Sequence, residues 1–257
     1  MSNLQKFVKK YYVIVLSLAF LILISCSFFF LKNSNPLLFD FSKTPKNSEE
    51  IESLVIISQS SMSVMAFGTE ESKSDNRVHL NFRPYLNLTI LEKEVKEFRI
   101  KNFKGSSESG KLILVPPTDL DVSSEGYNFL FGDYNTSIKN EDINSSGNSI
   151  EFKVVENETH LDEVRSKDYI IPNFSIILKD LGSVDYEKIL ERDSIFNSSK
   201  YIEYLEIDLD DLDTEFQFDI EIVFNDNTKY AKRFKGIFLG DSLRDNSSAI
   251  LDLEIVE

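Results

Sequence analysis

From about residue 51 onward, apolar and polar residues alternate along the chain in a series of short segments. The clearest is EFQFDIEIVF at 215–224, where every second residue is apolar and Gln217, Asp219 and Glu221 lie between. Successive side chains of a β-strand point to opposite faces of its sheet. The segment is therefore predicted to be a strand with one face in a core and the other in water.

This strand and its neighbour predict a β-hairpin over 215–239. The turn-forming sequence NDNT comes directly after the strand, and KYAKRFKGIFL then supplies a second one. Turn residues between two strand-like segments are typical of an antiparallel pair. We expect Phe218, Ile220 and Ile222 in the core and the acidic residues between them in water.

Similar segments recur along most of the chain after residue 75. Helical spacing occurs only at 183–193, with Ser183 as the predicted N-cap, and at 158–167. Many short strands with turn-rich connections indicate a mainly β fold, an antiparallel β-sandwich with few short helices. The length allows one elaborated sandwich or two small ones, with a sub-boundary near 139–149. The other predicted strands are RVHLNFR (77–83), YLNLTIL (85–91), KLILV (111–115), YNFLF (127–131), SIEFKVV (149–155) and AILDLEIVE (249–257).

A long apolar run precedes this β-rich region. Residues 13–31 contain no charged side chain, and Tyr11 and Tyr12 before them and Lys32 after them are residue types common at membrane interfaces. As a helix the run would be about 28 Å long, close to the thickness of a bilayer core. We therefore expect a transmembrane helix at 13–31 that holds the protein in the lipid bilayer.

Cys26, the only cysteine of the chain, leaves a second interpretation open. The sequence LISC at 23–26 has the features of a lipobox, in which the cysteine becomes the lipid-bearing first residue after the signal is cleaved. The next residues, SFFFL, are apolar, whereas a mature lipoprotein usually begins with a polar tether. We therefore favour a retained signal anchor, with lipidation of Cys26 as the alternative.

The lysines around the run predict its orientation. Lys6, Lys9 and Lys10 precede it without an acidic neighbour, so the positive-inside rule places the N-terminus in the cytoplasm. The predicted organisation is a short cytoplasmic segment at 1–12, the membrane helix at 13–31, a tether at 32–48 and an extracytoplasmic β-rich domain at 49–257.

Composition limits the partners of the exterior region. The chain has 28 basic and 43 acidic residues. Residues 1–31 contain three lysines and no acid, so the remainder has 25 basic and 43 acidic residues, a formal charge of −18. Such a surface repels nucleic acid. The lack of exterior cysteines and the abundance of Asn, Lys, Ile and Phe favour a bacterial cell membrane over a eukaryotic one.

Few residues offer catalytic chemistry. His79 and His160 are the only histidines, and no cysteine follows Cys26, which argues against zinc sites, Ser-His-Asp triads and thiol nucleophiles in the exterior region. Because His79 alternates with the core-facing residues of its strand, we expect it to face solvent. We assign no catalytic residue and no cofactor, and enzymatic activity is left open but not favoured.

One acidic cluster is a candidate metal site. Asp208, Asp210, Asp211 and Asp213 lie within EIDLDDLDTE, and carboxylate oxygens are the ligands that Ca²⁺ prefers. The spacing does not match an EF-hand loop. Alternation of the aspartates with Ile207 and Leu209 also fits a solvated strand face, which we favour.

These features predict a protein-binding or scaffold component of a cell-envelope assembly. An anchored, acidic, strand-rich region without a catalytic set carries this expectation, which implies a protein partner and no nucleic acid. Two alternatives remain open: a lipoprotein that binds a solute or Ca²⁺, and a carboxylate-dependent envelope hydrolase.

Overall fold

The computed structural model describes residues 44–72, 75–116, 127–129, 137–139, 143–153, 169–170, 172–192, 199–244 and 248–256. All of them belong to one unit that spans residues 40–257. They form mainly β structure with few short helices, as predicted. The predicted membrane run at 13–31, Cys26 and the predicted helix at 158–167 lie outside them. Within the described ranges, no helix is long and apolar enough to cross a membrane.

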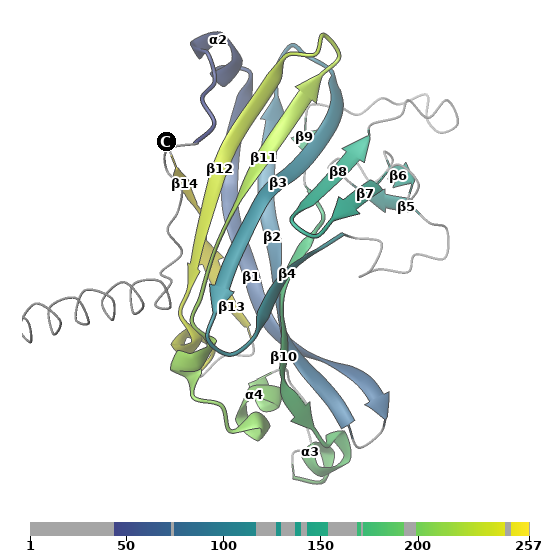
Figure 1. The fold of residues 1–257 in the computed structure, drawn as a ribbon, viewed down its shortest axis with the longest axis vertical. Coiled ribbons are helices and arrows are strands. Elements are labelled where there is room, and N and C mark those ends of the chain that lie inside the picture. Colours follow the sequence, from purple (N-terminus) through teal and green to yellow (C-terminus); the bar gives the residue numbers. More distant parts are fainter. Residues whose placement is uncertain are drawn as a thin grey trace, which may run out of the picture. The chain divides into compact units, whose positions relative to one another are not determined.

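Two antiparallel sheets make up most of this region (Figure 1). In sheet A the strand order is β13-β1-β2-β10-β4, and β9 also pairs with β2. In sheet B the order is β14-β12-β11-β3-β8-β7. The strands of sheet A are β1 (Val55–Ser72), β2 (Asp75–Ile90), β4 (Lys111–Val115), β9 (Tyr169–Ile170), β10 (Ser175–Val184) and β13 (Ser248–Asp252). Those of sheet B are β3 (Val95–Ser107), β7 (Ile143–Ser146), β8 (Ser149–Lys153), β11 (Thr214–Phe224), β12 (Lys229–Phe238) and β14 (Glu254–Val256), while β5 (Tyr127–Phe129) and β6 (Ser137–Lys139) pair separately.

A hydrophobic core joins the inner faces of the two sheets in a sandwich-like arrangement. Phe82 of sheet A meets Phe216 and Phe238 of sheet B edge to face, with ring centroids 5.6 and 5.4 Å apart. Aromatic rings favour this geometry. The predicted core residues of the hairpin, Phe218, Ile220 and Ile222, are fully buried, which confirms that part of the prediction.

Strand β2 unites two segments that the sequence analysis predicted as separate strands. Pro84 lies between the two predicted segments, and proline cannot donate a backbone hydrogen bond. In the structure Pro84 pairs with Met62 of β1 within one continuous strand. On the other side of β2, strand β10 pairs only as far as Phe82, and β9 begins to pair at Leu88. Neither strand pairs with Pro84, so β2 is locally an edge strand there.

The C-terminal segment forms two strands instead of the single one predicted. Strand β13 pairs with β1 in sheet A, and β14 pairs with β12 in sheet B. Between them, buried Leu253 donates its backbone N–H to Ser60 O at 2.9 Å. The chain therefore passes from one sheet to the other at this residue.

The short helices are α2 (Glu49–Glu52), α3 (Tyr186–Arg192), α4 (Ser199–Leu205) and the 3₁₀ turns η4 (Leu209–Leu212) and η5 (Gly240–Leu243). Helix α3 was predicted, but with the wrong N-cap. Ser183 pairs with Arg77 at the end of β10, and the Asp185 carboxylate instead accepts from the backbone N–H groups of Glu187 and Lys188.

Part of the loop-like sequence KGSSESG at 104–110 is strand. Strand β3 continues to Ser107, which pairs with Thr214 of β11. The segment around 139–149 contributes a hairpin of β7 and β8, with Gly147 at a φ of 49° in its turn and β8 paired to β3. Glycine adopts this left-handed conformation without strain.

Candidate interaction surface

The outer face of sheet B carries charged side chains that are largely removed from water. Gln217 and Asp219, expected to be wet, are only 1% and 4% exposed, and Glu221 is half-buried. The expectation was wrong because it treated β11 alone. The register sets long side chains of β12 and β3 on both sides of Gln217 and Asp219, and sets Arg99 of β3 beside Glu221.

Asp219 and Arg233 form a buried ion pair on this face. Arg233 donates from Nε to Asp219 Oδ1 at 2.6 Å and from Nη2 to Oδ2 at 2.9 Å. Asn102 adds a hydrogen bond to Oδ2 at 2.8 Å. Asn102 reaches the carboxylate because β3 bulges there, with Asn102 at a φ of 55°, a conformation that asparagine tolerates.

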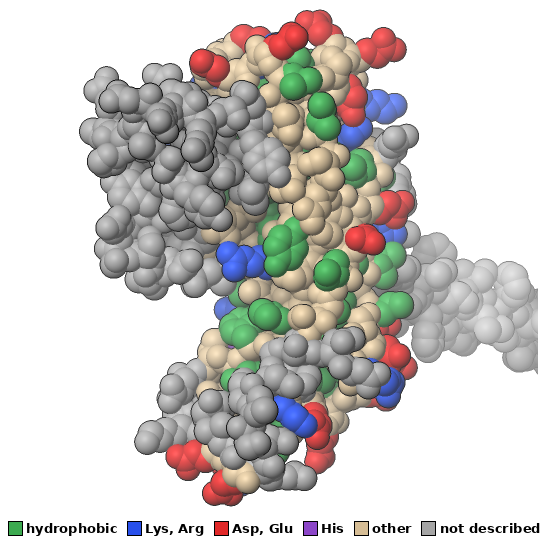
Figure 2. All heavy atoms as spheres, turned by 180° about the vertical axis from the view of Figure 1, so that it is seen from behind, with side chains coloured by type: hydrophobic (Ala, Val, Ile, Leu, Met, Phe, Trp, Pro, Cys, Tyr) green, Lys and Arg blue, Asp and Glu red, His purple; other side chains and the backbone are tan. Residues whose placement is uncertain are grey.

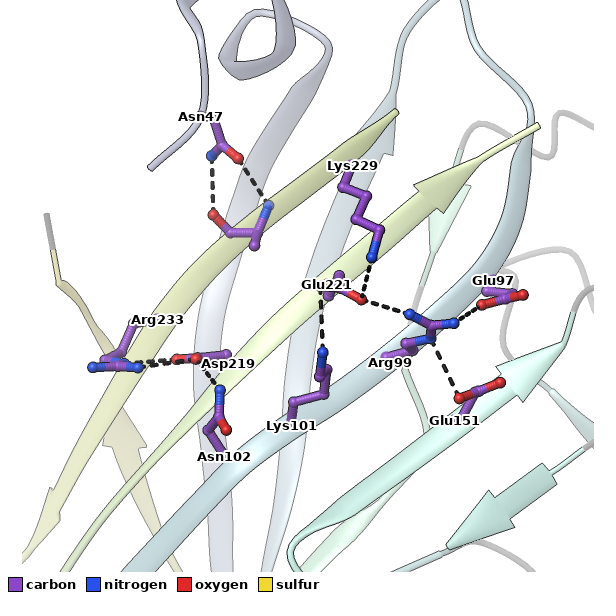
Figure 3. A network of polar contacts seen from close by, with 11 residues as sticks. Asn47, Glu97, Arg99, Lys101, Asn102, Glu151, Asp219, Glu221, Lys229 and Arg233 are labelled. Atoms are coloured by element: carbon purple, nitrogen blue, oxygen red, sulfur yellow. Dashed lines mark hydrogen bonds and ion pairs between the residues drawn. The ribbon is translucent and has the colours of Figure 1, made fainter. Parts of the chain in front are cut away.

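Arg99 of β3 is the centre of a second cluster (Figure 3). Its guanidinium is paired with carboxylates from three strands, namely Glu97 of β3, Glu151 of β8 at 3.3 Å and Glu221 of β11 at 2.8 Å. Burial acts to lower the pKa of Arg99, but these carboxylates outweigh it and raise the pKa above its ordinary value. The cluster therefore links strands β8, β3 and β11 through one permanently charged side chain.

Glu221 connects this cluster to further cations. Lys101 Nζ lies 3.5 Å and Lys229 Nζ 3.7 Å from its carboxylate oxygens. Burial acts to raise the pKa of Glu221, but the hydrogen bond from Arg99 and the charges of the two lysines lower it below its ordinary value. The acidic and basic groups of this face thus neutralise one another and do not need an external partner.

Asn47 attaches the segment before α2 to the edge of sheet B (Figure 3). Its Nδ2 donates to Ala231 O, and its Oδ1 accepts from Ala231 N, both at 2.9 Å. Strand β14 pairs only with residues 233–235 of β12. The side-chain amide of Asn47 thereby pairs with the part of the β12 edge that β14 leaves open. Nδ2 also donates to Glu52 at 2.7 Å, so Asn47 holds both α2 and the sheet edge.

The outer face of sheet A differs sharply in charge. Over residues 248–252 of β13, 56–65 of β1 and 81–89 of β2, its outward positions carry Ser, Asn, Gln, Thr and apolar side chains with two charges, Arg83 and Asp252. Farther along β2, Arg77 also points outward and pairs with Asp180. We name this surface the weakly charged face. It consists of Ile56, Gln59, Ser61, Ser63, Met65, Asn81, Arg83, Tyr85, Asn87, Thr89, Ser248, Ile250 and Asp252.

Several large apolar side chains of the weakly charged face are exposed to water. Ile250 is 76% exposed, Ile56 50%, Tyr85 46% and Met65 44%. Figure 2 views this side of the molecule, where uncharged and hydrophobic side chains dominate the middle and acidic ones lie at the two ends and along the right edge. An exposed apolar patch bordered by polar residues is typical of an interaction surface.

The polar side chains of the weakly charged face bind one another across the strands. Asn87 Nδ2 donates to Gln59 Oε1 at 2.9 Å, and Gln59 Nε2 donates to Ser61 Oγ at 3.4 Å. Arg83 and Asp252 are exposed, and neither forms an ion pair with any residue that the structure describes. These two charges are therefore available to an external partner.

His79, expected in solvent, is buried beside this face. It is 6% exposed, lies against the Phe67 ring, and its Nδ1 accepts from the backbone N–H of Asp180 at 3.2 Å. Nε2 must then carry the proton and donate to Thr69 Oγ1 at 3.0 Å. The expectation was wrong because β10 bulges between Leu178 and Gly182 and brings Asp180 onto the ring. Burial lowers the pKa of His79.

The candidate metal ligands lie in and around η4, a 3₁₀ turn and not the strand face that we favoured. Asp208 caps this turn by accepting from Asp210 N at 3.3 Å, and Asp213 accepts from Gly240 N at 2.9 Å. All four aspartates are exposed, as expected of a solvated surface. Among the residues with described positions, no three His, Cys, Asp or Glu side chains are grouped so that they could hold a metal ion.

The sequence analysis missed β1, the strand at the centre of the weakly charged face. Its signal was present, because no charged residue occurs from Ser53 to Thr69 and Met62, Val64 and Ala66 alternate with polar or more exposed residues.

Comparisons with protein-family models and with curated proteins find no match to this chain.

Proposed function

We propose that the chain is a single-pass, N-in membrane protein whose extracytoplasmic β-sandwich binds protein through the weakly charged face, as part of a cell-envelope assembly. Residues 13–31 supply the proposed anchor, since they are uncharged and mostly apolar and are preceded by Lys6, Lys9 and Lys10.

The weakly charged face is the observation that carries the binding role. A body with 43 acidic residues keeps one sheet face nearly free of acid and exposes Ile250, Ile56, Tyr85 and Met65 on it. Hydrophobic anchors within an uncharged surface gain free energy when a complementary protein covers them. The outer face of sheet B offers less of this gain, because its charges are largely paired with one another and, among the described strand residues, it exposes one large apolar side chain, Ile237.

Photo-cross-linking in intact membranes tests this role. A photoreactive residue replaces Ser63, in the middle of the weakly charged face, in the full-length chain. As a matched control, it replaces exposed Lys104 on the outer face of sheet B. We expect cross-linked protein products from position 63 and few or none from position 104. Equal yields from both positions, or none from position 63, would contradict the proposed binding surface.

A further inference from the structure

We propose that the protein covering the weakly charged face is a second copy of this chain, bound face to face about a two-fold axis. This inference rests on the proposed function and names the partner of the same surface. Its basis is the pattern formed by Arg83, Asp252 and the exposed apolar side chains around them.

The two unpaired charges are placed so that the face is complementary to itself. Ser63 of β1 pairs with Arg83 on one side and Ile250 on the other, and Asp252 lies two residues beyond Ile250 on β13. Arg83 and Asp252 therefore lie diagonally across β1 with opposite charges. A two-fold axis in the plane of contact, perpendicular to the line between them, brings each Arg83 opposite the other copy's Asp252 and forms two equivalent ion pairs.

The same axis crosses β1 between Ser61 and Ser63, whose small side chains allow two sheets to approach. It brings Ile250 of each copy toward Ser63 and Met65 of the other. Ile250 and Met65, 76% and 44% exposed, would then be covered. The acidic ends of the two bodies lie away from the axis, so this face also minimises repulsion between two strongly negative chains.

The size of the face predicts that the contact is weak in solution. Two strands with about nine residues each in the face and the five-residue β13, about 4.8 Å apart, present on the order of 400 Å². This is about half of the roughly 800 Å² that each partner contributes to a standard stable interface. Anchoring of both copies in one membrane raises their effective concentration. We therefore expect pairing in the membrane and little dimer from the diluted soluble body.

Charge exchange between two tagged full-length copies tests the pairing. One copy carries the photoreactive residue at position 63, and the measured product is the cross-link that contains both tags. Arg83→Asp in both copies, or Asp252→Arg in both, places like charges opposite each other and should reduce this product roughly tenfold. Arg83→Asp in one copy with Asp252→Arg in the other restores both attractive pairs and should return the product to near the wild-type yield.

The mixed pair also serves as the folding control, because restored cross-linking requires both variants to be folded. The inference fails if the single variants keep the wild-type yield or if the mixed pair does not recover. Cross-links from position 63 only to other proteins would refute the second copy and leave the proposed binding function intact. Loss of every protein cross-link at position 63 in the wild-type chain would refute both.

Discussion

Asp219 holds a full negative charge at a place from which water is nearly excluded. Its side chain is 6% exposed and that of its partner Arg233 4%. Removing one member of a buried ion pair leaves the other charge unsolvated and unpaired. We predict that Asp219→Ala lowers the free energy of unfolding by about 3–5 kcal/mol, measured by denaturant melts of the body from residue 44.

The exposed pair of Asp241 and Arg244 is the matched control. Its side chains are 57% and 63% exposed, so Asp241→Ala should cost at most about 1 kcal/mol. Replacing Asp219 and Arg233 together by leucine should recover part of the loss, because no charge is then stranded. Similar costs for Asp219→Ala and Asp241→Ala would show that Asp219 is not in a buried pair.

Ile220 and Glu221 are neighbours in β11 with opposite environments. Ile220 is fully buried, so Ile220→Ala should cost about 2–5 kcal/mol through lost transfer energy and the cavity left behind. The sequence placed Glu221 in water, where Glu221→Ala would be almost neutral. Since Glu221 bridges Arg99, Lys101 and Lys229, we now predict a loss of about 1 kcal/mol. Equal costs in parallel melts would contradict the strand register.

His79 makes stability depend on pH near neutrality. Its folded pKa is lowered below the ordinary value of 6.5 by burial and by Lys179 and Arg77, and Asp180 opposes this only in part. Well above pH 6.5 His79 is neutral in both the folded and the unfolded chain. As the pH falls below 6.5, the unfolded chain takes up a proton that the folded chain does not, so stability falls until the pH reaches the lowered pKa.

His79→Gln tests this dependence. Glutamine does not titrate and can keep the hydrogen bond to Thr69. We predict that stability declines as the pH falls from about 7.5 through 6.5 in the wild-type chain and declines less in the variant. Denaturant melts at intervals across this range give the comparison, and parallel curves for the two proteins would show that His79 is not the group responsible.

At the scale of elements, local patterns predicted some strands well and others poorly. The hairpin of β11 and β12 was predicted because strict alternation and a turn sequence lie within 25 residues of each other. The N-cap of α3 was misassigned because β10 continues through Ser183 to Val184. This continuation follows a bulge and depends on pairing with β2. Neither this bulge nor the local edge at Pro84 can be seen in an isolated segment.

Helix α2 depends on a contact that no local pattern predicts. We expect Asn47→Ala to remove the two hydrogen bonds to Ala231 and the one to Glu52. Each of these bonds stabilises the structure by about 0.5–1.5 kcal/mol. Their loss should therefore accelerate hydrogen exchange of the Ala231 amide by about tenfold or more. Ser48→Ala is the control, since it removes only the N-cap of α2. Unchanged exchange at Ala231 in the Asn47 variant would contradict the pairing.

At the scale of the whole molecule, the sequence predicted the strand-rich body but not the weakly charged face. The candidate residues Asp208 to Asp213 were conspicuous because they are charged and close in sequence. The weakly charged face is inconspicuous because it is assembled from β1, β2 and β13, and β13 is far from the other two strands in sequence. An absence of charge becomes visible only once the strands are aligned.

The proposed topology gives a prediction for the intact chain. An alkaline phosphatase fused after Glu257 should be active, because the positive-inside rule places the body outside the cytoplasm. Mass spectrometry of the purified protein should find an N-terminus upstream of Cys26. A diacylglycerol-modified Cys26 as first residue would establish the lipoprotein alternative, and an inactive fusion with a protease-protected body would reverse the orientation.

The attachment of Asn47 to β12 has a mechanical consequence. If residues 13–31 are held in the membrane, tension along the chain enters the body near Thr44 and reaches Asn47 before any strand. The paired amide and the short helix behind it would yield first, at the cost of a few hydrogen bonds. Strand β1 is paired with β2 along nearly all of its length and comes after Asn47 in the chain. The hydrogen bonds of Asn47 can therefore break and re-form under tension while the sandwich stays folded.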